Sequence, residues 1–148
     1  MIYIYLAGPI TGLNFEDAND WRRVVSDDLK HSNIIGISPL RCESLKEGET
    51  YNASYNCPKF GEPLAIASKN FLDVQKCDLL LAYLPKISIG TLIEIGWAIA
   101  LQKPVIVVSK LPEIREHSIL NAKVGWMLES FEDAVDVIFG LFEDYVVW

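Results

Sequence analysis

Residues that form metal sites and disulfides are scarce in this sequence. Its 148 residues include three cysteines, Cys42, Cys57 and Cys77, and two histidines, His31 and His117. Because the cysteines are widely spaced and form no C-x-x-C pair, we expect no zinc site. An odd number of cysteines without a signal-peptide pattern is typical of the reducing cytoplasm, so we expect a cytoplasmic location.

A basic composition and long apolar runs are also missing. The 13 lysines and arginines are outnumbered by 20 acidic residues, which gives a formal net charge of -7. Since proteins that bind nucleic acid need a basic surface, we expect no nucleic-acid partner. No apolar run reaches the roughly 18 residues of a membrane span, so we expect no membrane partner either. A small anionic ligand is compatible with this charge, because backbone N–H groups at a helix start can hold it.

The chain does contain a regular alternation of short apolar runs and amphipathic segments. Hydrophobic residues make up 51% of it, which is enough for the core of one domain. Strands that alternate with helices indicate an α/β protein, and uninterrupted apolar runs indicate parallel strands. We predict a single domain over residues 1–148, a doubly wound, flavodoxin-like sheet of five parallel strands in the order 2-1-3-4-5 with helices on both faces. Strands are expected at about 1–7, 33–39, 79–84, 103–108 and 124–128, and helices at about 15–29, 64–76, 88–101 and 131–142.

Two features flank this pattern at its ends. Asn14 is a suitable N-cap for the first helix. The chain ends in an apolar tail, 145–148, and such tails often dock on their own domain or on a neighbouring subunit. The apolar stripe of the first helix is expected to consist of Ala18, Trp21, Val24, Val25 and Leu29.

The helix and strand pattern breaks between Leu40 and about Pro63. A loop of this length in a compact domain is usually functional or mobile, and we interpret it as a flap over a site. Its aromatic residues, Tyr51, Tyr55 and Phe60, either stack on a ligand or pin the loop to the domain.

Two unusual loops follow the first and third predicted strands. The first, Gly8 to Gly12, is neither a G-x-G-x-x-G motif nor a Walker A loop, but its glycines let a ligand approach the backbone. The second begins at Ser88 and opens a helix. In a sheet of order 2-1-3-4-5 the chain reverses between the first and third strands, and ligands bind outside their carboxyl ends. The two loops should therefore meet at one site.

Glu94 lies one turn into the helix that opens at this predicted site, on a face with apolar neighbours such as Trp97 and Ala98. One reading is a capping box, Thr91-x-x-Glu94, in which the carboxylate folds back to a backbone N–H. The other is a catalytic carboxylate in a partly dry cleft. Because the topology brings both loops to this place, we favour the catalytic reading.

The motifs in their order along the chain resemble the nucleoside 2-deoxyribosyltransferase family. They are Tyr5-Leu6-Ala7-Gly8-Pro9-Ile10-Thr11-Gly12, Asp78 before the third strand, and Ser88-x-Gly90-Thr91-x-x-Glu94. This resemblance implies an enzyme that cleaves the N-glycosidic bond of 2-deoxynucleosides through a covalent deoxyribosyl-glutamate. The sugar then passes to a second nucleobase, or to water in the hydrolase branch. The implied partners are a small-molecule deoxynucleoside or deoxynucleotide and a free nucleobase. The mechanism needs no metal or organic cofactor.

The resemblance also assigns roles to single residues. Glu94 falls on the nucleophile of the family, and Tyr5 on the tyrosine that positions it. Gly8 and Ile10 fall on the base pocket. Further candidate substrate-binding residues are Pro9, Gly90 and Thr91.

Two positions depart from the pattern of the family. The first is Asn70, where an aspartate usually handles the proton of the base. An amide cannot act as a general acid, and Asp73, one helical turn on, is a possible substitute. The second is Ser88, where transferases for free nucleosides often carry an aspartate. In the related 5'-monophosphate N-hydrolases a serine there binds phosphate. His117 lies where that branch reaches the phosphate from a neighbouring subunit, although an ordinary surface loop residue is the favoured reading of this histidine.

Three functional hypotheses follow. The leading one is a 2-deoxyribosyltransferase, and the second is a 2-deoxynucleoside 5'-monophosphate N-hydrolase with the phosphate on Ser88. The third is a catalytically weak nucleotide-binding module, which Asn70 favours. We also expect a homodimer or a higher homo-oligomer, because of the apolar tail and because the family uses neighbouring subunits to complete its site.

Overall fold

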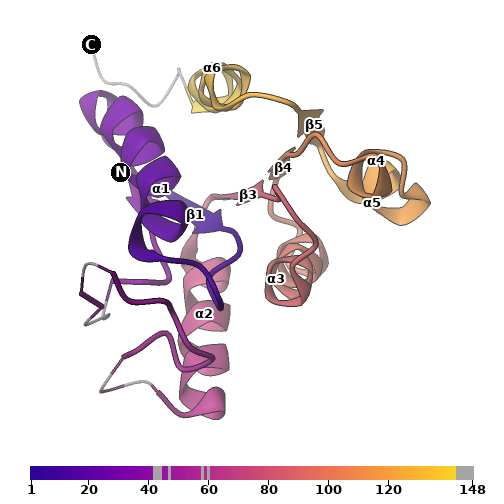
Figure 1. Cartoon of the computed structure of the whole chain (residues 1–148). Helices are drawn as coiled ribbons and strands as arrows, with labels where there is room; N and C mark the ends of the chain where they lie inside the picture. The colour runs from indigo at the N-terminus through magenta and orange to yellow at the C-terminus, as the bar shows by residue number, and fades with distance from the viewer. Residues whose placement is uncertain (42–44, 47, 58, 60, 143–148) are drawn as a thin grey trace.

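Five strands form one parallel sheet in the order β2-β1-β3-β4-β5, as predicted, in the computed structural model of Figure 1. The structure describes residues 1–41, 45–46, 48–57, 59 and 61–142. The strands are β1 (Ile2–Ala7), β2 (Ile34–Ile37), β3 (Leu79–Tyr83), β4 (Val105–Val108) and β5 (Trp126–Leu128).

Helices cover both faces of this sheet (Figure 1). Helices α1 and α6 pack on one face, and α2 and α3 pack on the other. The helical segments are α1 (Phe15–Leu29), the 3-10 turn η1 (Lys30–Ser32), α2 (Pro63–Lys76), α3 (Ile89–Ala100), α4 (Pro112–Arg115), α5 (Ser118–Lys123) and α6 (Phe131–Phe142). Within the described ranges, no helix is both long and apolar enough to cross a membrane.

The two-residue period of β1 divides its side chains between the two layers. Ile4 and Leu6 belong to the core under α1 and α6, whereas Tyr5 and Ala7 belong to the core under α2 and α3. Successive side chains of a strand point to opposite faces, so this division follows from the register of the strand. It directs the Tyr5 side chain towards α3.

Helix α1 begins as predicted, with the Asn14 side chain accepting a hydrogen bond from the Asp17 N–H at 2.7 Å. Its buried stripe differs from the prediction at one position: Val24 is 53% exposed, and Arg22 is buried instead. At roughly 100° per residue, Arg22 lies on the same face as Ala18, whereas Val24 is turned well away from it. Helical geometry therefore places a charged residue on the core face.

The segment before α2 is attached to the turn that follows β1. Tyr51 is buried, and its backbone exchanges hydrogen bonds with Leu13 O and Gly12 N, both at 2.8 Å. Its hydroxyl also accepts a hydrogen bond from Asn19 at 2.6 Å. Tyr51 therefore pins the loop to the domain. Phe60 and the tail 145–148 lie outside the described residues.

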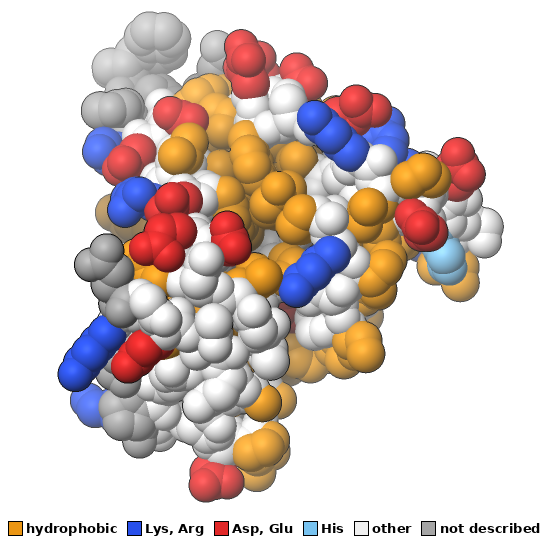
Figure 2. Space-filling view, viewed as in Figure 1, with side chains coloured by type: hydrophobic (Ala, Val, Ile, Leu, Met, Phe, Trp, Pro, Cys, Tyr) orange, Lys and Arg blue, Asp and Glu red, His pale blue; other side chains and the backbone are white. Residues whose placement is uncertain are grey.

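A cavity lies along the carboxyl edge of the sheet, between α6 and the ends of β3 and β4. It has a volume of about 470 Å³. Figure 2 shows hydrophobic side chains gathered between α1, α6 and the sheet, with acidic groups over the surrounding surface. This cavity, called the apolar cavity below, is lined mainly by Tyr83, Pro85, Val108, Leu111 and Phe131.

Candidate active site

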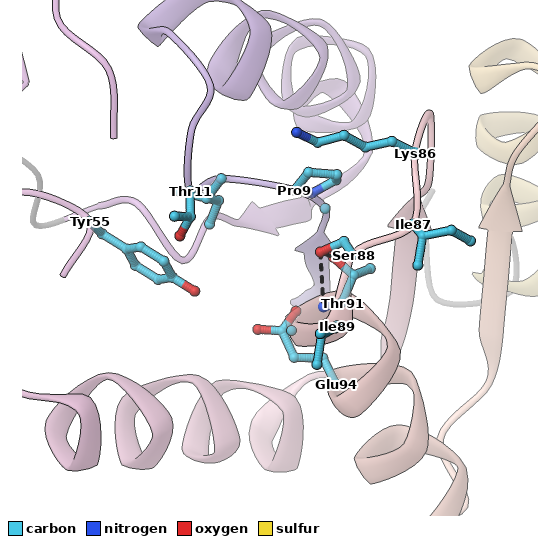
Figure 3. Close-up of a pocket in the computed structure, with 12 residues that line it drawn as sticks. Pro9, Thr11, Tyr55, Lys86, Ile87, Ser88, Ile89, Thr91 and Glu94 are labelled. Atoms are coloured by element: carbon cyan, nitrogen blue, oxygen red, sulfur yellow. Dashed lines mark hydrogen bonds between the residues drawn. The ribbon is translucent and has the colours of Figure 1, made fainter. Parts of the chain in front are cut away.

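The loops after β1 and β3 meet at the carboxyl edge of the sheet, as the predicted topology required. Between them lies a cavity of about 370 Å³, called the switch-point cavity below (Figure 3). One wall is Gly8 to Thr11, and the other is the segment from Lys86 to the first turn of α3. Tyr55 from the long loop and Glu94 from α3 complete the lining. The sheet thus brings together three segments that are distant in the sequence.

Glu94 is buried beside this cavity, with 7% of its surface exposed. Its Oε1 accepts a hydrogen bond from the Tyr5 hydroxyl at 2.8 Å and another from the Asn70 amide at 3.1 Å. Both bonds go to the same oxygen, so Oε2 is the one left to face the cavity. Three elements, β1, α2 and α3, therefore fix the position of this carboxylate.

The capping-box reading of Glu94 is wrong. Helix α3 begins at Ile89, and its N-cap is Ser88, whose Oγ accepts hydrogen bonds from the Thr91 N–H and from its hydroxyl. Thr91 therefore lies inside the first turn and its N–H is already bonded. Glu94 bonds instead to residues of β1 and α2, which a purely local helix cap would not require.

Burial raises the pKa of Glu94 to about 7. The Tyr5 hydrogen bond, the charges of Arg22 and Lys69 and the Asn70 hydrogen bond all act in the opposite direction. Burial and the neighbouring Glu94 raise the pKa of Tyr5 well above its usual value, so Tyr5 stays a hydrogen-bond donor. Near neutral pH, Glu94 can therefore exist as a carboxylic acid or as a carboxylate, and the carboxylate is the form that acts as a nucleophile or general base.

The Asn70 side chain is oriented from its other end. Lys69 donates hydrogen bonds to Asn70 Oδ1 at 3.0 Å and to Pro39 O at 2.8 Å. An ammonium group only donates, so the amide must turn its oxygen to Lys69 and its NH₂ group to Glu94. Asn70 thus supports the carboxylate form of Glu94. It carries no proton that it could release to a leaving group.

The structure does not bring Asp73 to the switch-point cavity. Both of its carboxylate oxygens accept hydrogen bonds from the Arg41 guanidinium, at 2.6 and 2.8 Å. Nor does the structure bring His117 to the site within one chain. That residue is exposed and stands at the start of α5, and it does not line the switch-point cavity.

A cluster of donors stands at the mouth of the cavity, opposite the Gly8–Thr11 wall. Ser88 stands at the start of α3, and Lys86 extends across Pro9 in Figure 3. The first N–H groups of a helix have no partner within the helix and carry partial positive charge. Among the described residues that line the cavity, Glu94 is the only acidic one. This mouth can therefore accept an anionic group.

One residue near the site, Arg22, was not predicted from the sequence, and Tyr55 was predicted only with two alternative roles. Arg22 lies buried behind Gly8, to whose carbonyl it donates a hydrogen bond at 3.0 Å. Tyr55 adopts a left-handed backbone conformation, with φ of 54°, and lines two cavities that share Glu94. A non-glycine residue in this conformation often marks a functional site. The only local signal for Arg22 was its place on the apolar stripe of α1.

A buried carboxylate at the switch point of a doubly wound sheet is the arrangement of an enzyme site. The family model for nucleoside 2-deoxyribosyltransferase matches residues 4–138. The chain therefore belongs to the nucleoside 2-deoxyribosyltransferase family, as the resemblance indicated. It is an enzyme of the N-glycosyl class, which comprises deoxyribosyltransferases and N-glycosidases.

Solved structures share this fold at low sequence identity. A 2-deoxyribosyltransferase from Bacillus psychrosaccharolyticus is 18% identical, with a TM-score of 0.65, over 90% of this chain and 90% of that chain. A CMP N-glycosidase from Clostridium botulinum is 17% identical, with a TM-score of 0.55, over 92% and 97%. A molybdenum cofactor binding protein from Rippkaea orientalis is 19% identical, with a TM-score of 0.65, over 95% and 97%. A search of curated proteins gives no match.

Proposed function

We propose that this protein is a nucleoside 2-deoxyribosyltransferase in which Glu94 is the nucleophile. The observation that carries the proposal is the buried carboxylate of Glu94, with Oε1 held by Tyr5 and Asn70 and Oε2 left towards the switch-point cavity. A fixed, partly desolvated carboxylate oxygen beside a ligand-sized cavity is what attack on a sugar carbon requires.

The reaction proceeds in two displacements at the anomeric carbon. Glu94 Oε2 forms a bond to this carbon while the bond to the base nitrogen breaks, and the base leaves with the electron pair. A second base then attacks the same carbon from the vacated side and releases the carboxylate, so the configuration is retained. The leaving base takes its proton from water, because the Asn70 amide cannot supply one and burial raises the pKa of Tyr55.

A chromatographic assay with deoxynucleosides and a foreign free base tests this proposal. The wild type should produce a new deoxynucleoside, and Glu94→Ala should not. Intact-protein mass spectrometry of the wild type with a deoxynucleoside alone should reveal the mass of one added deoxyribosyl group. Glu132→Gln, which changes an exposed acid on α6, serves as the control and should behave as wild type. Transfer that survives in Glu94→Ala would exclude Glu94 as the nucleophile.

A second candidate function is hydrolysis of 2-deoxynucleoside 5'-monophosphates. The donor cluster at the cavity mouth favours it, because Lys86, Ser88 and the N-terminus of α3 suit a phosphate dianion. The similar protein from Clostridium botulinum is a CMP N-glycosidase by name. Release of free base from monophosphates alone, lost in Ser88→Asp through charge repulsion, would establish this function over transfer.

A third candidate is a nucleotide-binding module that has lost turnover. Asn70 favours it because it removes the usual acid. One of the proteins with this fold is described as a cofactor-binding protein. Nucleotide binding measured by calorimetry, with no product in either assay, would support this alternative. Product formation in either assay would exclude it.

We also propose that the protein is a homo-oligomer. Helices α2 and α3 pack side by side and leave apolar side chains in solvent, with Leu64 78%, Ile89 76% and Ile93 48% exposed. A cavity of about 280 Å³ that reaches Glu94 also opens between these two helices. A second copy of the chain would cover this face. Light scattering should give a multiple of 16.7 kDa, and Ile93→Glu should reduce it to the monomer. A monomeric wild type would overturn the proposal.

A further inference from the structure

Arg22 is a buried cation on α1, immediately behind the switch-point cavity. Only 3% of its surface is exposed. Its guanidinium donates to Leu6 O at 3.1 Å, to Gly8 O at 3.0 Å and to Ala18 O, so each of these three hydrogen bonds goes to a neutral carbonyl. The guanidinium carbon also lies 4.6 Å from the centre of the Trp21 ring. A buried charge with neutral partners is costly and calls for a role.

The hydrogen bonds of Arg22 hold the chain where it leaves the sheet. Leu6 is the second-last residue of β1, and Gly8 is the first residue of the Gly8–Thr11 wall of the switch-point cavity. The two carbonyls, on either side of Ala7, are bound by one rigid planar group. A fork of this kind fixes direction as well as distance. Arg22 therefore sets the angle between β1 and the Gly8–Thr11 wall that follows it.

The same residue provides a positive charge that complements Glu94. Among the described residues, the buried charged residues are Arg22, Asp73 and Glu94. The Lys69 side chain is also only 9% exposed, but Asp73 lies 4.0 Å from it and is paired with Arg41 as well. Arg22 and Glu94 thus remain as the two buried charges without a direct ionic partner. They flank β1 on opposite faces of the sheet, with Tyr5 on the Glu94 side. In the low dielectric of the protein interior, the attraction between these two charges persists across β1.

Other groups that face Glu94 act beside this charge. Tyr5 reaches it from β1, and Asn70 and Lys69 reach it from α2. Tyr55 and Lys86 line the same cavity. Arg22 is more buried than Lys69 or Lys86. The charge of Arg22 also lowers the pKa of Glu94 more than the charge of Lys69 does.

We propose that Arg22 is a positioning residue for the Glu94 site. Its guanidinium clamps the carbonyls of Leu6 and Gly8, and its buried charge favours the carboxylate form of Glu94. The part of this inference that concerns turnover rests on the proposed function. The part that concerns the ionisation of Glu94 stands without it.

The first test is an NMR titration of the wild type from about pH 5 to about pH 9. This range brackets the raised pKa of Glu94, which is about 7. The carbon signal of the Glu94 carboxyl and the side-chain nitrogen signal of Arg22 should shift with one common midpoint. In Glu94→Gln the Arg22 signal should no longer follow that midpoint. Arg23, exposed and paired with Asp20, is the internal control and should not follow it in either protein. An Arg22 signal that ignores the titration of Glu94 would overturn the proposal.

The second test compares Arg22→Gln, Arg22→Lys and Arg23→Gln. In Arg22→Gln the midpoint of the Glu94 titration and the acid limb of the kcat/KM profile should both move up by about one pH unit. Arg22→Lys keeps the charge but not the fork, so its midpoint should stay near wild type while kcat/KM falls. Arg23→Gln should change neither.

The outcomes separate this inference from the proposed function. A folded Arg22→Gln protein with an unchanged Glu94 midpoint would overturn the inference even if the enzyme is active. If circular dichroism shows that Arg22→Gln does not fold, the wild-type titration decides. A wild type that lacks turnover on every substrate would remove the proposed function and leave the NMR result valid.

Discussion

Two cavities open along the same edge of the sheet, and they differ in what is buried beneath them. The larger, apolar cavity has Ser109 as its buried polar residue, and the Ser109 hydroxyl donates to Leu84 O at 2.7 Å. The smaller, switch-point cavity has Glu94, with one carboxylate oxygen bonded twice and the other left to the cavity. The volume of a cavity therefore does not mark the candidate active site. The mark is a buried ionisable group with a carboxylate oxygen that has no hydrogen bond to another described residue.

The largest expected effect separates the two cavities by their chemistry. Glu94→Gln keeps the shape of the side chain but removes the proposed nucleophile, so turnover should fall by about 10³-fold or more. Ser109→Ala should leave turnover near wild type. It should lower the free energy of unfolding by about 1–2 kcal/mol, because Leu84 O and Leu111 N each lose a hydrogen bond. Steady-state kinetics and urea unfolding of both variants measure this. Equal losses of activity would erase the distinction between the cavities.

A second prediction concerns the pH dependence of stability, which only the switch-point cavity should show. Burial raises the pKa of Glu94 from 4.5 to about 7, so the folded state holds a proton that the unfolded state loses. The resulting stabilisation is fully present below about pH 4.5 and is lost as pH rises through about 7, a difference of about 3 kcal/mol.

Urea unfolding of the wild type and of Glu94→Gln between these pH values isolates this contribution. The variant has no ionisable group at this position, so the difference between the two proteins should grow as the pH rises. Parallel stability curves would show that the environment of Glu94 does not disfavour its charge.

A third prediction tests the hydrogen bond between β1 and α3. Tyr5→Phe removes the donor to Glu94 Oε1 and keeps the ring in the core. The carboxylate should become harder to form, so kcat should fall by roughly tenfold to a hundredfold, and the acid limb of the pH profile should move to higher pH. Tyr83→Phe, at the apolar cavity, is the matched control. If both variants have the same pH profile, the Tyr5 hydroxyl has no electrostatic role.

The smallest expected effect concerns Gly8, at the start of the Gly8–Thr11 wall of the switch-point cavity. A Cβ atom added to Gly8 would lie 2.8 Å from the Trp21 ring and 3.3 Å from Tyr83 O, which is too close without a shift of the turn. Gly8→Ala should therefore lower the melting temperature by a few degrees, an effect of about 1–2 kcal/mol. Gly96→Ala meets no atom within 4 Å, and on α3 it should raise stability by about 0.5–1 kcal/mol. Calorimetry of both variants measures the difference, and an equally stable Gly8→Ala would mean that the wall can move freely.

Much of the fold could be predicted from the sequence because hydrophobic periodicity is a local property. The five apolar runs correspond to the five strands, and the predicted order is the order of the structure. The polar segment around His117 was harder, because α4 and α5 span only 4 and 6 residues and show little periodicity. The stripe of α1 was misread at Val24, since apolar character was given more weight than the angle around the helix.

The sequence by itself determined the alternation of strands and helices, the two loops at the carboxyl edge and the placement of Glu94 one turn into α3. Only the tertiary structure decided which groups surround that carboxylate. Tyr5 lies 89 residues before Glu94 and Asn70 lies 24 before it, and no local pattern records such contacts. The orientation of the Asn70 amide by Lys69 and the position of Arg22 behind Gly8 are likewise set by packing across the sheet. Local periodicity specifies which face of an element is buried, but the partners on that face depend on how separate elements come together.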